Sequence, residues 1–219
     1  MRIISLIIML AGFKGLTSSP TLINKYLSNY FFFPKSTEVS SPMQFNDSTD
    51  PSGLAWGKEL SQAIKYAEEN GFSPDYLFLI DMRIASGKKR FFVFNINDFR
   101  VECSGLVAHG NCNTHFLEGA KFSNTPNCGC SSMGKYKVGP SYFGEFGKSY
   151  RLYGLDSTNS NAFRRGIVLH GFDPVPDHEI YPEPLCNSFG CPMVNRSFLN
   201  KLSAIIDKST KPVLLWIYE

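Results

Sequence analysis

The feature that most constrains the fold is a pair of apolar runs rich in aromatic and β-branched residues, YLFLIDMRIA at 76–85 and RFFVFNI at 90–96. Such runs are typical of β-strands, and the Ser-Gly-Lys-Lys segment between them is short enough for a hairpin loop. Comparable runs at 99–108, 150–155, 165–170 and 213–218 predict further strands. The sequence therefore predicts a mainly β domain with an antiparallel sheet.

Two segments have the spacing of amphipathic helices. Asp50 and Pro51 suit the N-cap and first position of a helix, and a helical stripe then continues toward Gly71. A second helix is predicted at 197–207, where the apolar residues again recur on one face. The two stripes consist of Leu60, Ala63, Ile64 and Ala67, and of Phe198, Leu202, Ile205 and Ile206. We expect both helices to pack on the periphery of the sheet.

The first 52 residues differ in character from the rest of the chain. Residues 1–13 contain one arginine followed by an apolar run of about eleven residues, the length of a signal-peptide hydrophobic region and too short to span a bilayer. We expect 1–19 to be a signal peptide or an N-terminal anchor, with a buried segment of a cytoplasmic protein as the alternative. Residues 20–52 are rich in Ser, Thr, Pro and Asn and predict a linker, which leaves 53–219 as the main domain.

Overall composition places few limits on the partner. With 219 residues and 43% hydrophobic content, the chain can form one sizeable core. The net charge of +3 is small and favours neither nucleic acid nor a membrane surface as a partner.

Candidate chemistry is concentrated in residues 164–194. Ile167, Val168 and Leu169 form a short strand that ends at His170, and Cys191 follows Gly190 after a proline-rich loop. A thiol with an imidazole as its base is the arrangement of a cysteine nucleophile. The backbone N–H groups of Phe189, Gly190 and Cys191 are candidate donors to an oxyanion. A buried thiol and a core histidine are the alternative interpretation.

Six motifs in order surround these two residues. They are AHG at 108–110, FSN at 122–124, SSMGKY at 131–136, YFGEFGKSYRLYGLD at 142–156, NAFRRGIVLHG at 161–171 and SFGCP at 188–192. In these motifs the chain resembles the murein L,D-transpeptidase catalytic domain family, the YkuD-like enzymes, in the branch whose active stretch reads Ser-Trp/Phe-Gly-Cys-Pro. The better-known branch has a histidine where this chain has Phe189, and an arginine after the Gly-Cys pair where this chain has Pro192 and Met193.

The resemblance implies a YkuD-like β-sandwich or barrel of mixed sheets with peripheral helices, formed by 53–219 as a catalytic domain. It implies that Cys191 is the nucleophile, that His170 is the base and that Gly171 orients the base through its backbone. It also suggests that His109 faces the active site; a structural histidine that bonds the loop backbone is the alternative.

The polar, glycine-rich segment 110–147 is expected to be a long functional loop that frames the cleft. Residues expected to shape this loop or contact substrate are Ser123, Asn124, Ser131, Ser132 and Tyr136, with Ser188 beside the Gly-Cys pair. Arg164 or Arg165 is a candidate partner for a substrate carboxylate, but neighbours on a strand point to opposite faces, so only one of them would face the cleft.

Six cysteines allow three interpretations. His109, Cys112, His115, Cys128 and Cys130 form a cluster that could hold a tetrahedral metal, although the spacings match no known zinc finger. In an exported chain a disulfide is the more natural use, and Cys103, Cys112, Cys128, Cys130 and Cys186 are the candidates once Cys191 is kept free. Free buried thiols are the third possibility, and the spacing does not determine connectivity.

From the motifs and the resemblance we expect an exported cysteine L,D-transpeptidase that acts on peptidoglycan stem peptides, in the periplasm or cell envelope. We expect no cofactor, no metal, no nucleic-acid partner and no membrane span beyond an N-terminal anchor. An L,D-carboxypeptidase that uses the same residues, and a non-catalytic wall-binding or metal-binding module on the same fold, are the alternatives.

Overall fold

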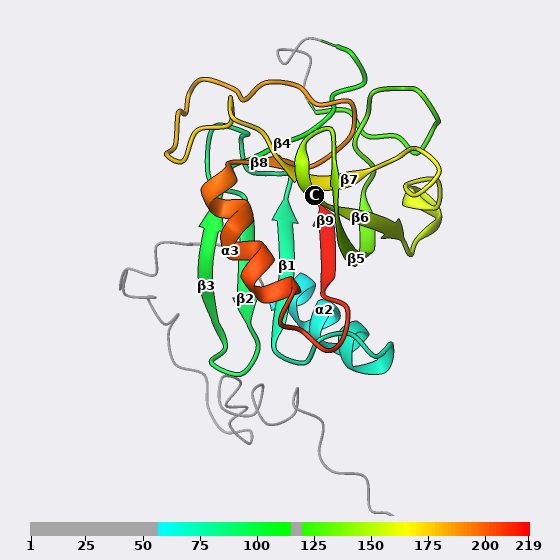
Figure 1. Cartoon of the computed structure of the whole chain (residues 1–219), viewed down its shortest axis with the longest axis vertical. Coiled ribbons are helices and arrows are strands. Elements are labelled where there is room, and N and C mark those ends of the chain that lie inside the picture. The colour runs from blue at the N-terminus through cyan, green and yellow to red at the C-terminus, as the bar shows by residue number, and fades with distance from the viewer. Residues whose placement is uncertain (1–56, 115–119) are drawn as a thin grey trace, which may run out of the picture. The chain divides into compact units, whose positions relative to one another are not determined.

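A computed structural model describes residues 57–114 and 120–219 (Figure 1). The expected signal or anchor at 1–19, the linker at 20–52 and the helix start at Asp50 and Pro51 lie outside the described residues.

The described elements are two α-helices, one short 3₁₀ helix and nine strands. In chain order they are α2 (Gly57–Glu69), β1 (Tyr76–Asp81), β2 (Phe91–Asn95), β3 (Arg100–Gly105), β4 (Val107–Ala108), β5 (Gly134–Gly144), β6 (Gly147–Gly154), η2 (Ser157–Asn159), β7 (Val168–Gly171), β8 (Met193–Val194), α3 (Arg196–Ile206) and β9 (Leu214–Tyr218). The prediction of a mainly β domain with peripheral helices is confirmed. In the part of α2 that the structure describes, the predicted apolar stripe is buried.

All nine strands belong to one sheet, in the order β3-β2-β1-β9-β5-β6-β7-β8-β4. Most neighbouring strands are antiparallel, but β1 pairs with β9 and β7 pairs with β8 in parallel, so the sheet is mixed rather than purely antiparallel. The two edge strands, β3 and β4, are consecutive in the chain and only Leu106 separates them. Because one residue joins the two edges, the sheet curls until they meet, which produces a nearly closed, barrel-like sheet.

Side chains alternate between the two faces of the sheet along each strand, so buried apolar residues lie on both faces. On the face covered by α3, Phe198 lies edge-on to Phe91 with 5.3 Å between ring centroids, and alternate residues of β1 and β9 complete this cluster. The helix α3 begins at the N-cap Asn195, whose side chain accepts a hydrogen bond from the Ser197 N–H. On the other face α2 packs against β9. Figure 1 shows α3 in front of the strands and α2 behind their lower ends.

Three predictions about element boundaries are wrong. The segment 110–147 is not one loop, because β5 begins at Gly134 and forms a long hairpin with β6; of the described residues in it, only 110–114 and 120–133 are largely irregular. The strand predicted at 165–170 begins at Val168, and Arg164 and Arg165 lie in the turn before it. The strand predicted at 99–108 is interrupted at Leu106 and forms β3 and β4 on opposite edges of the sheet.

Within 57–114 and 120–219, no helix is both long enough and apolar enough to cross a membrane.

Candidate active site

The predicted nucleophile and base are brought together by the parallel pairing of β7 with β8. His170 on β7 lies opposite Met193 on β8, so Cys191, two residues before Met193, lies beside Val168 at the start of β7. The Val168 N–H donates to Cys191 Sγ at 3.4 Å, and Sγ is 3.9 Å from the Gly166 carbonyl oxygen. Val168 and His170 are two residues apart on one strand and share a face of the sheet. The pairing therefore brings Cys191, which lies just before β8, alongside the strand that carries His170.

His170 is almost fully buried and held by two contacts. Its Nδ1 lies 3.1 Å from the Gly171 carbonyl oxygen. A carbonyl only accepts hydrogen bonds, so Nδ1 carries the proton and Nε2 is the basic nitrogen. The Phe146 ring stacks on the imidazole, with 4.2 Å between centroids and 23° between planes. Burial lowers the pKa of His170, and Arg196 lowers it further, while the bond to Gly171 acts in the opposite direction.

Cys191 is partly buried, and this environment favours the neutral thiol. Burial raises the pKa of Cys191, while the hydrogen bond from the Val168 N–H and the positive charge of Arg165 act to lower it. With the pKa of the thiol raised and that of His170 lowered, the pair is mainly thiol and neutral imidazole at neutral pH. Such a pair could act as a nucleophile only if a base removed the thiol proton during attack.

The turn that carries Cys191 depends on Gly190, which has a φ of 115°. A Cβ at this position would lie 2.6 Å from the Cys130 carbonyl oxygen, so only glycine fits. The Gly190 N–H donates to Ser188 Oγ at 3.1 Å, and Ser131 Oγ donates to the Gly190 carbonyl at 3.0 Å. Phe189 is 85% exposed. The Gly190 N–H is thus already bonded within the turn, unlike the N–H groups of Phe189 and Cys191, for which no hydrogen bond is found among the described residues.

Arg165 connects several loop segments around this turn. Its guanidinium donates to the Ser123 carbonyl at 3.0 Å, to Ser132 Oγ at 2.6 Å and to the Cys130 carbonyl. Arg164, its neighbour in the turn, is exposed. The expectation that alternation on a strand would select one of the two for the cleft is wrong, because neither is on a strand.

The other polar residues expected at the site mostly stabilise loops. Asn124 donates to the Ser157 carbonyl and to Ser160 Oγ, and its own carbonyl oxygens accept from Asn161. The hydroxyl of Tyr136, on β5, is buried and donates to the Ser132 carbonyl at 2.8 Å. These bonds hold 122–136 and 157–161 together beside Arg165.

Two cysteines of the predicted Cys/His cluster form a disulfide, Cys112–Cys130. Cys103, Cys128, Cys186 and Cys191 are free thiols. His115 lies outside the described residues, and among those that are described no group of three or more potential metal ligands is found. Two of the candidate metal ligands of the alternative interpretation are thus consumed by the disulfide.

His109 does not lie free in the cleft. It is buried, and its Nδ1 accepts a hydrogen bond from Arg90 Nη2 at 2.8 Å. Its carbonyl accepts from the Ser188 N–H at 3.0 Å, which links it to the 188–191 turn. Arg90 and Phe146 are site residues that the sequence does not reveal, because each reaches its histidine across strands and no local pattern marks the contact.

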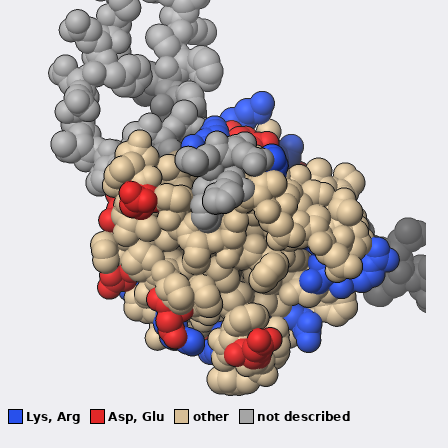
Figure 2. All heavy atoms as spheres, turned by 90° about the horizontal axis from the view of Figure 1, so that it is seen from above, with Lys and Arg blue, Asp and Glu red and all other residues tan. Residues whose placement is uncertain are grey.

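Most side chains on the loop-bearing end of the molecule are uncharged. Figure 2 views this end from above and shows Lys, Arg, Asp and Glu side chains mainly around the rim, with uncharged residues across the centre. Ligand recognition in the centre of this face would therefore depend on backbone groups, aromatic rings and a few buried charges.

The sequence model of the L,D-transpeptidase catalytic domain family matches residues 50–218. No curated protein matches the chain.

Among solved structures, similar chains include an L,D-transpeptidase from Xylanimonas cellulosilytica, with 16% identity over 70% of this chain and 68% of that chain and a TM-score of 0.37. The helical cell shape determining protein from Campylobacter jejuni has 13% identity over 66% of this chain and 48% of that chain, with a TM-score of 0.44. An L,D-transpeptidase from Enterococcus faecium has 10% identity over 66% and 50%, with a TM-score of 0.41. This chain thus spans about half the length of the last two proteins. Because these TM-scores are all below 0.5, membership of a family rests on the sequence match to residues 50–218.

Proposed function

The chain belongs to the L,D-transpeptidase catalytic domain family, and on that premise we propose that it is an exported cysteine acyltransferase acting on peptidoglycan stem peptides. Cys191 is the nucleophile and His170 is the general base. The observation that carries the proposal is the pairing of β7 with β8. His170 lies opposite Met193, and Cys191 is two residues before Met193. The signal or anchor at 1–19 would supply export to the periplasm or cell envelope.

In the first half-reaction, His170 Nε2 accepts the Cys191 thiol proton as Sγ attacks the carbonyl carbon before the terminal D-alanine of a tetrapeptide stem. The tetrahedral intermediate collapses when the C–N bond breaks, and the imidazolium gives its proton to the departing D-alanine amine. The product is a thioester on Cys191. Gly171 keeps Nδ1 protonated by accepting its hydrogen bond, so that Nε2 remains the proton carrier.

In the second half-reaction, the amine of a diamino acid from another stem attacks the thioester carbonyl. His170 removes the amine proton and returns a proton to the departing thiolate, which restores the resting pair. Water in place of the amine would give a carboxypeptidase. The same residues serve both reactions, and the acceptor that reaches the thioester decides between them.

The oxyanion of both intermediates would be stabilised by backbone N–H groups of the 188–191 turn. Phe189 and Cys191 supply the candidate donors, while Gly190, whose N–H is bonded to Ser188 Oγ, contributes the turn conformation. Loss of one such donor typically costs about a hundred- to a thousandfold in kcat.

The test is intact-protein mass spectrometry of the protein incubated with a disaccharide tetrapeptide. We expect an acyl adduct on Cys191 and release of D-alanine, and neither in Cys191→Ala. Cys103→Ala is the matched control, because Cys103 is also a partly buried free thiol but lies on β3, at an edge of the sheet.

The products distinguish the two acceptors. A cross-linked dimer identifies a transpeptidase, and a tripeptide alone identifies a carboxypeptidase. Absence of both the adduct and D-alanine release in folded, reduced protein would refute the peptidoglycan substrate and favour a non-catalytic module.

A further inference from the structure

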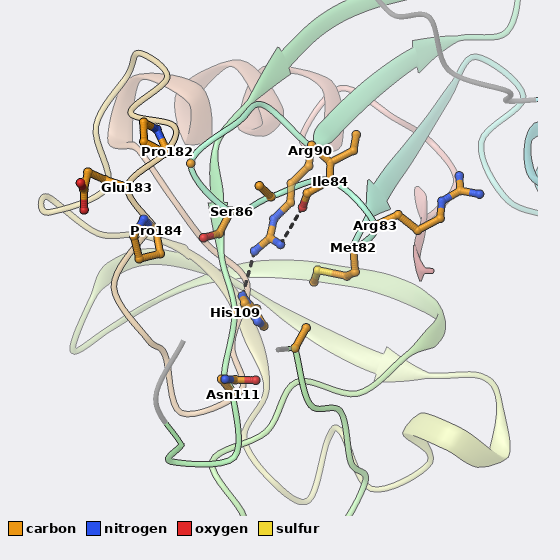
Figure 3. A pocket seen from close by; sticks show the side chains of 13 residues that line it. Met82, Arg83, Ile84, Ser86, Arg90, His109, Asn111, Pro182, Glu183 and Pro184 are labelled. Carbon is orange, nitrogen blue, oxygen red and sulfur yellow. Dashed lines mark hydrogen bonds between the residues drawn. The ribbon is translucent and has the colours of Figure 1, made fainter. Parts of the chain in front are cut away.

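A concave site lies close to the 188–191 turn. This cavity of about 280 Å³ has three walls: 82–87 together with Arg90; His109, Asn111 and Ala120; and 182–184. Figure 3 shows Arg90, His109 and Asn111 in succession along one side, with Pro182, Glu183 and Pro184 across from them. The N–H groups of Ile180 and Tyr181 both donate to the Gly87 carbonyl and hold two of the walls together.

Arg90 brings a buried positive charge to this cavity. Only 2% of the residue is exposed, and its guanidinium donates to the carbonyls of Val107 and Ile84 and to His109 Nδ1, all of them neutral acceptors. Among the described residues, no carboxylate lies within ion-pair distance of Arg90, although the more distant charge of Asp81 partly offsets the effect of burial, which lowers the pKa of Arg90. A buried charge is usually paired with an opposite one.

His109 adds a buried donor without an acceptor. Arginine can only donate, so Nδ1 accepts from Arg90 and the proton of the neutral ring is on Nε2. Nε2 is buried and has no hydrogen-bond partner among the described residues. Burial and the charge of Arg90 lower the pKa of His109 to about 4, so the ring is neutral at physiological pH. A buried donor left unpaired is costly, and native structures contain few of them.

The cavity and the catalytic turn share their backbone support. Besides the bond from the Ser188 N–H to the His109 carbonyl, Gly110 packs directly on the turn: a Cβ on Gly110 would lie 2.5 Å from Gly190 N. A ligand fixed by His109 would therefore be held on the same rigid backbone that presents Cys191.

We propose that the Arg90–His109 cavity binds a carboxylate of the stem peptide, with His109 Nε2–H as the hydrogen-bond donor and Arg90 as the source of positive potential. This inference rests on the proposed function. A carboxylate offers only acceptors, and its negative charge would give Arg90 a direct ion-pair partner, which it does not have among the described residues.

The other charged groups of the lining are compatible with an anion. Arg83 is engaged with Asp81 at 2.6 Å and with Glu59 at 3.6 Å. Glu183 is exposed, so water screens its charge.

Binding is measured with the Cys191→Ala protein and a disaccharide tetrapeptide, each free carboxylate of which is amidated in turn. We expect one amidation, and not the others, to weaken binding by about ten- to a hundredfold, the effect of losing a hydrogen bond to a charged group. The same amidation should have little effect in Cys191→Ala/His109→Phe. His109→Gln keeps an N–H donor and should restore part of the discrimination. His178→Phe, at an exposed histidine, is the matched control.

A direct readout comes from ¹⁵N-histidine NMR, in which the tetrapeptide should shift the Nε2–H resonance of His109 and the singly amidated peptide should not. Three outcomes would each overturn the inference. The first is that all amidations weaken binding equally, and the second is that Cys191→Ala/His109→Phe still distinguishes the free from the amidated peptide. The third is that the tetrapeptide does not bind at all. If wild-type Cys191 is acylated while discrimination is absent, the carboxylate site fails and the proposed function stands. If Cys191 is not acylated, the proposed function itself fails.

Discussion

At the scale of single residues, Phe146 has the most direct influence on the proposed base. Its ring covers one face of the His170 imidazole and contributes to the burial that lowers the pKa of that histidine. A lowered pKa keeps the imidazole neutral, and hence able to accept the thiol proton, at a lower pH than an ordinary histidine would allow. Phe146 is thus a positioning residue that acts through His170.

We predict that Phe146→Ala raises the pKa of His170 toward the ordinary value, because water reaches the exposed face of the ring. Protonated His170 cannot act as a base, so the acid limb of the kcat/KM profile should move to higher pH, and activity at acidic pH should fall more than activity at pH 8. An NMR titration of His170 measures the pKa directly. Phe143→Ala, at an 83% exposed position of the same hairpin, should leave the acid limb in place. Identical shifts in both variants would contradict the role of Phe146.

The residues of the site differ in how far the sequence could identify them. His170 and Cys191 stand in local patterns, a strand end and a glycine turn, that mark them as candidates from the sequence alone. The sequence makes Arg165 a candidate to bind a substrate carboxylate from a strand. In the structure it lies in a turn, and its guanidinium donates hydrogen bonds to Ser132 Oγ and to loop carbonyls. Arg90 is followed by the strand β2, and nothing nearby in the sequence indicates that it reaches His109.

At the scale of elements, β5 shows why a strand can be read as a loop. Gly139 and Pro140 lie in its middle, and both residues are usually depleted in strands. The structure accommodates them at a register shift between Val138 and Ser141, where the pairing with β6 is interrupted and then resumes. Whether a strand can contain such a bulge depends on the strand that pairs with it. The sequence near Gly139 and Pro140 therefore does not show that a strand continues through them.

The described residues just before β5 are fixed to the 188–191 turn by several contacts. Ser131 donates to the Gly190 carbonyl, and the Cys130 carbonyl fills the space where Gly190 would carry a side chain. The Cys112–Cys130 disulfide closes this segment over a sequence separation of 18 residues. Cross-linking two such positions reduces the conformational freedom of the unfolded chain.

We predict that Cys112→Ser/Cys130→Ser lowers the free energy of unfolding by about 2–4 kcal/mol, the typical contribution of a disulfide closing a loop of this length. Denaturant unfolding measures the change. A reductant should destabilise the wild-type protein by a similar amount and leave the double variant unaffected. A thiol titration of the denatured, unreduced protein provides the check on the premise, since six reactive thiols would mean that the disulfide is absent.

At the scale of the whole described domain, closure of the sheet depends on its β3–β4 edge. The strands predicted from the sequence account for the mainly β character, but not for the order in which they pair, because pairing depends on contacts distant in sequence. Arg90 bonds across this edge: its N–H donates to the Gly105 carbonyl of β3 and its guanidinium to the Val107 carbonyl of β4. Burial and this guanidinium together lower the pKa of His109, so the closed sheet also affects how the domain responds to acid.

The final prediction concerns the stability of the domain as the pH falls. His109 has an ordinary pKa of 6.5 in the unfolded chain and about 4 in the folded domain. Above pH 6.5 the side chain of His109 is neutral in both states. As the pH falls from 6.5 to 4, the unfolded state gains the proton first, so this group lowers the free energy of unfolding by about 3 kcal/mol in all.

His109→Gln does not titrate and can still accept a hydrogen bond from Arg90. The gap in unfolding free energy between wild type and His109→Gln should therefore be constant from pH 8 to 6.5 and shift by about 3 kcal/mol in favour of the variant by pH 4. Denaturant titrations at a series of pH values measure it, with His178→Gln as the exposed control. A gap that is independent of pH would mean that His109 is not held neutral by burial beside Arg90.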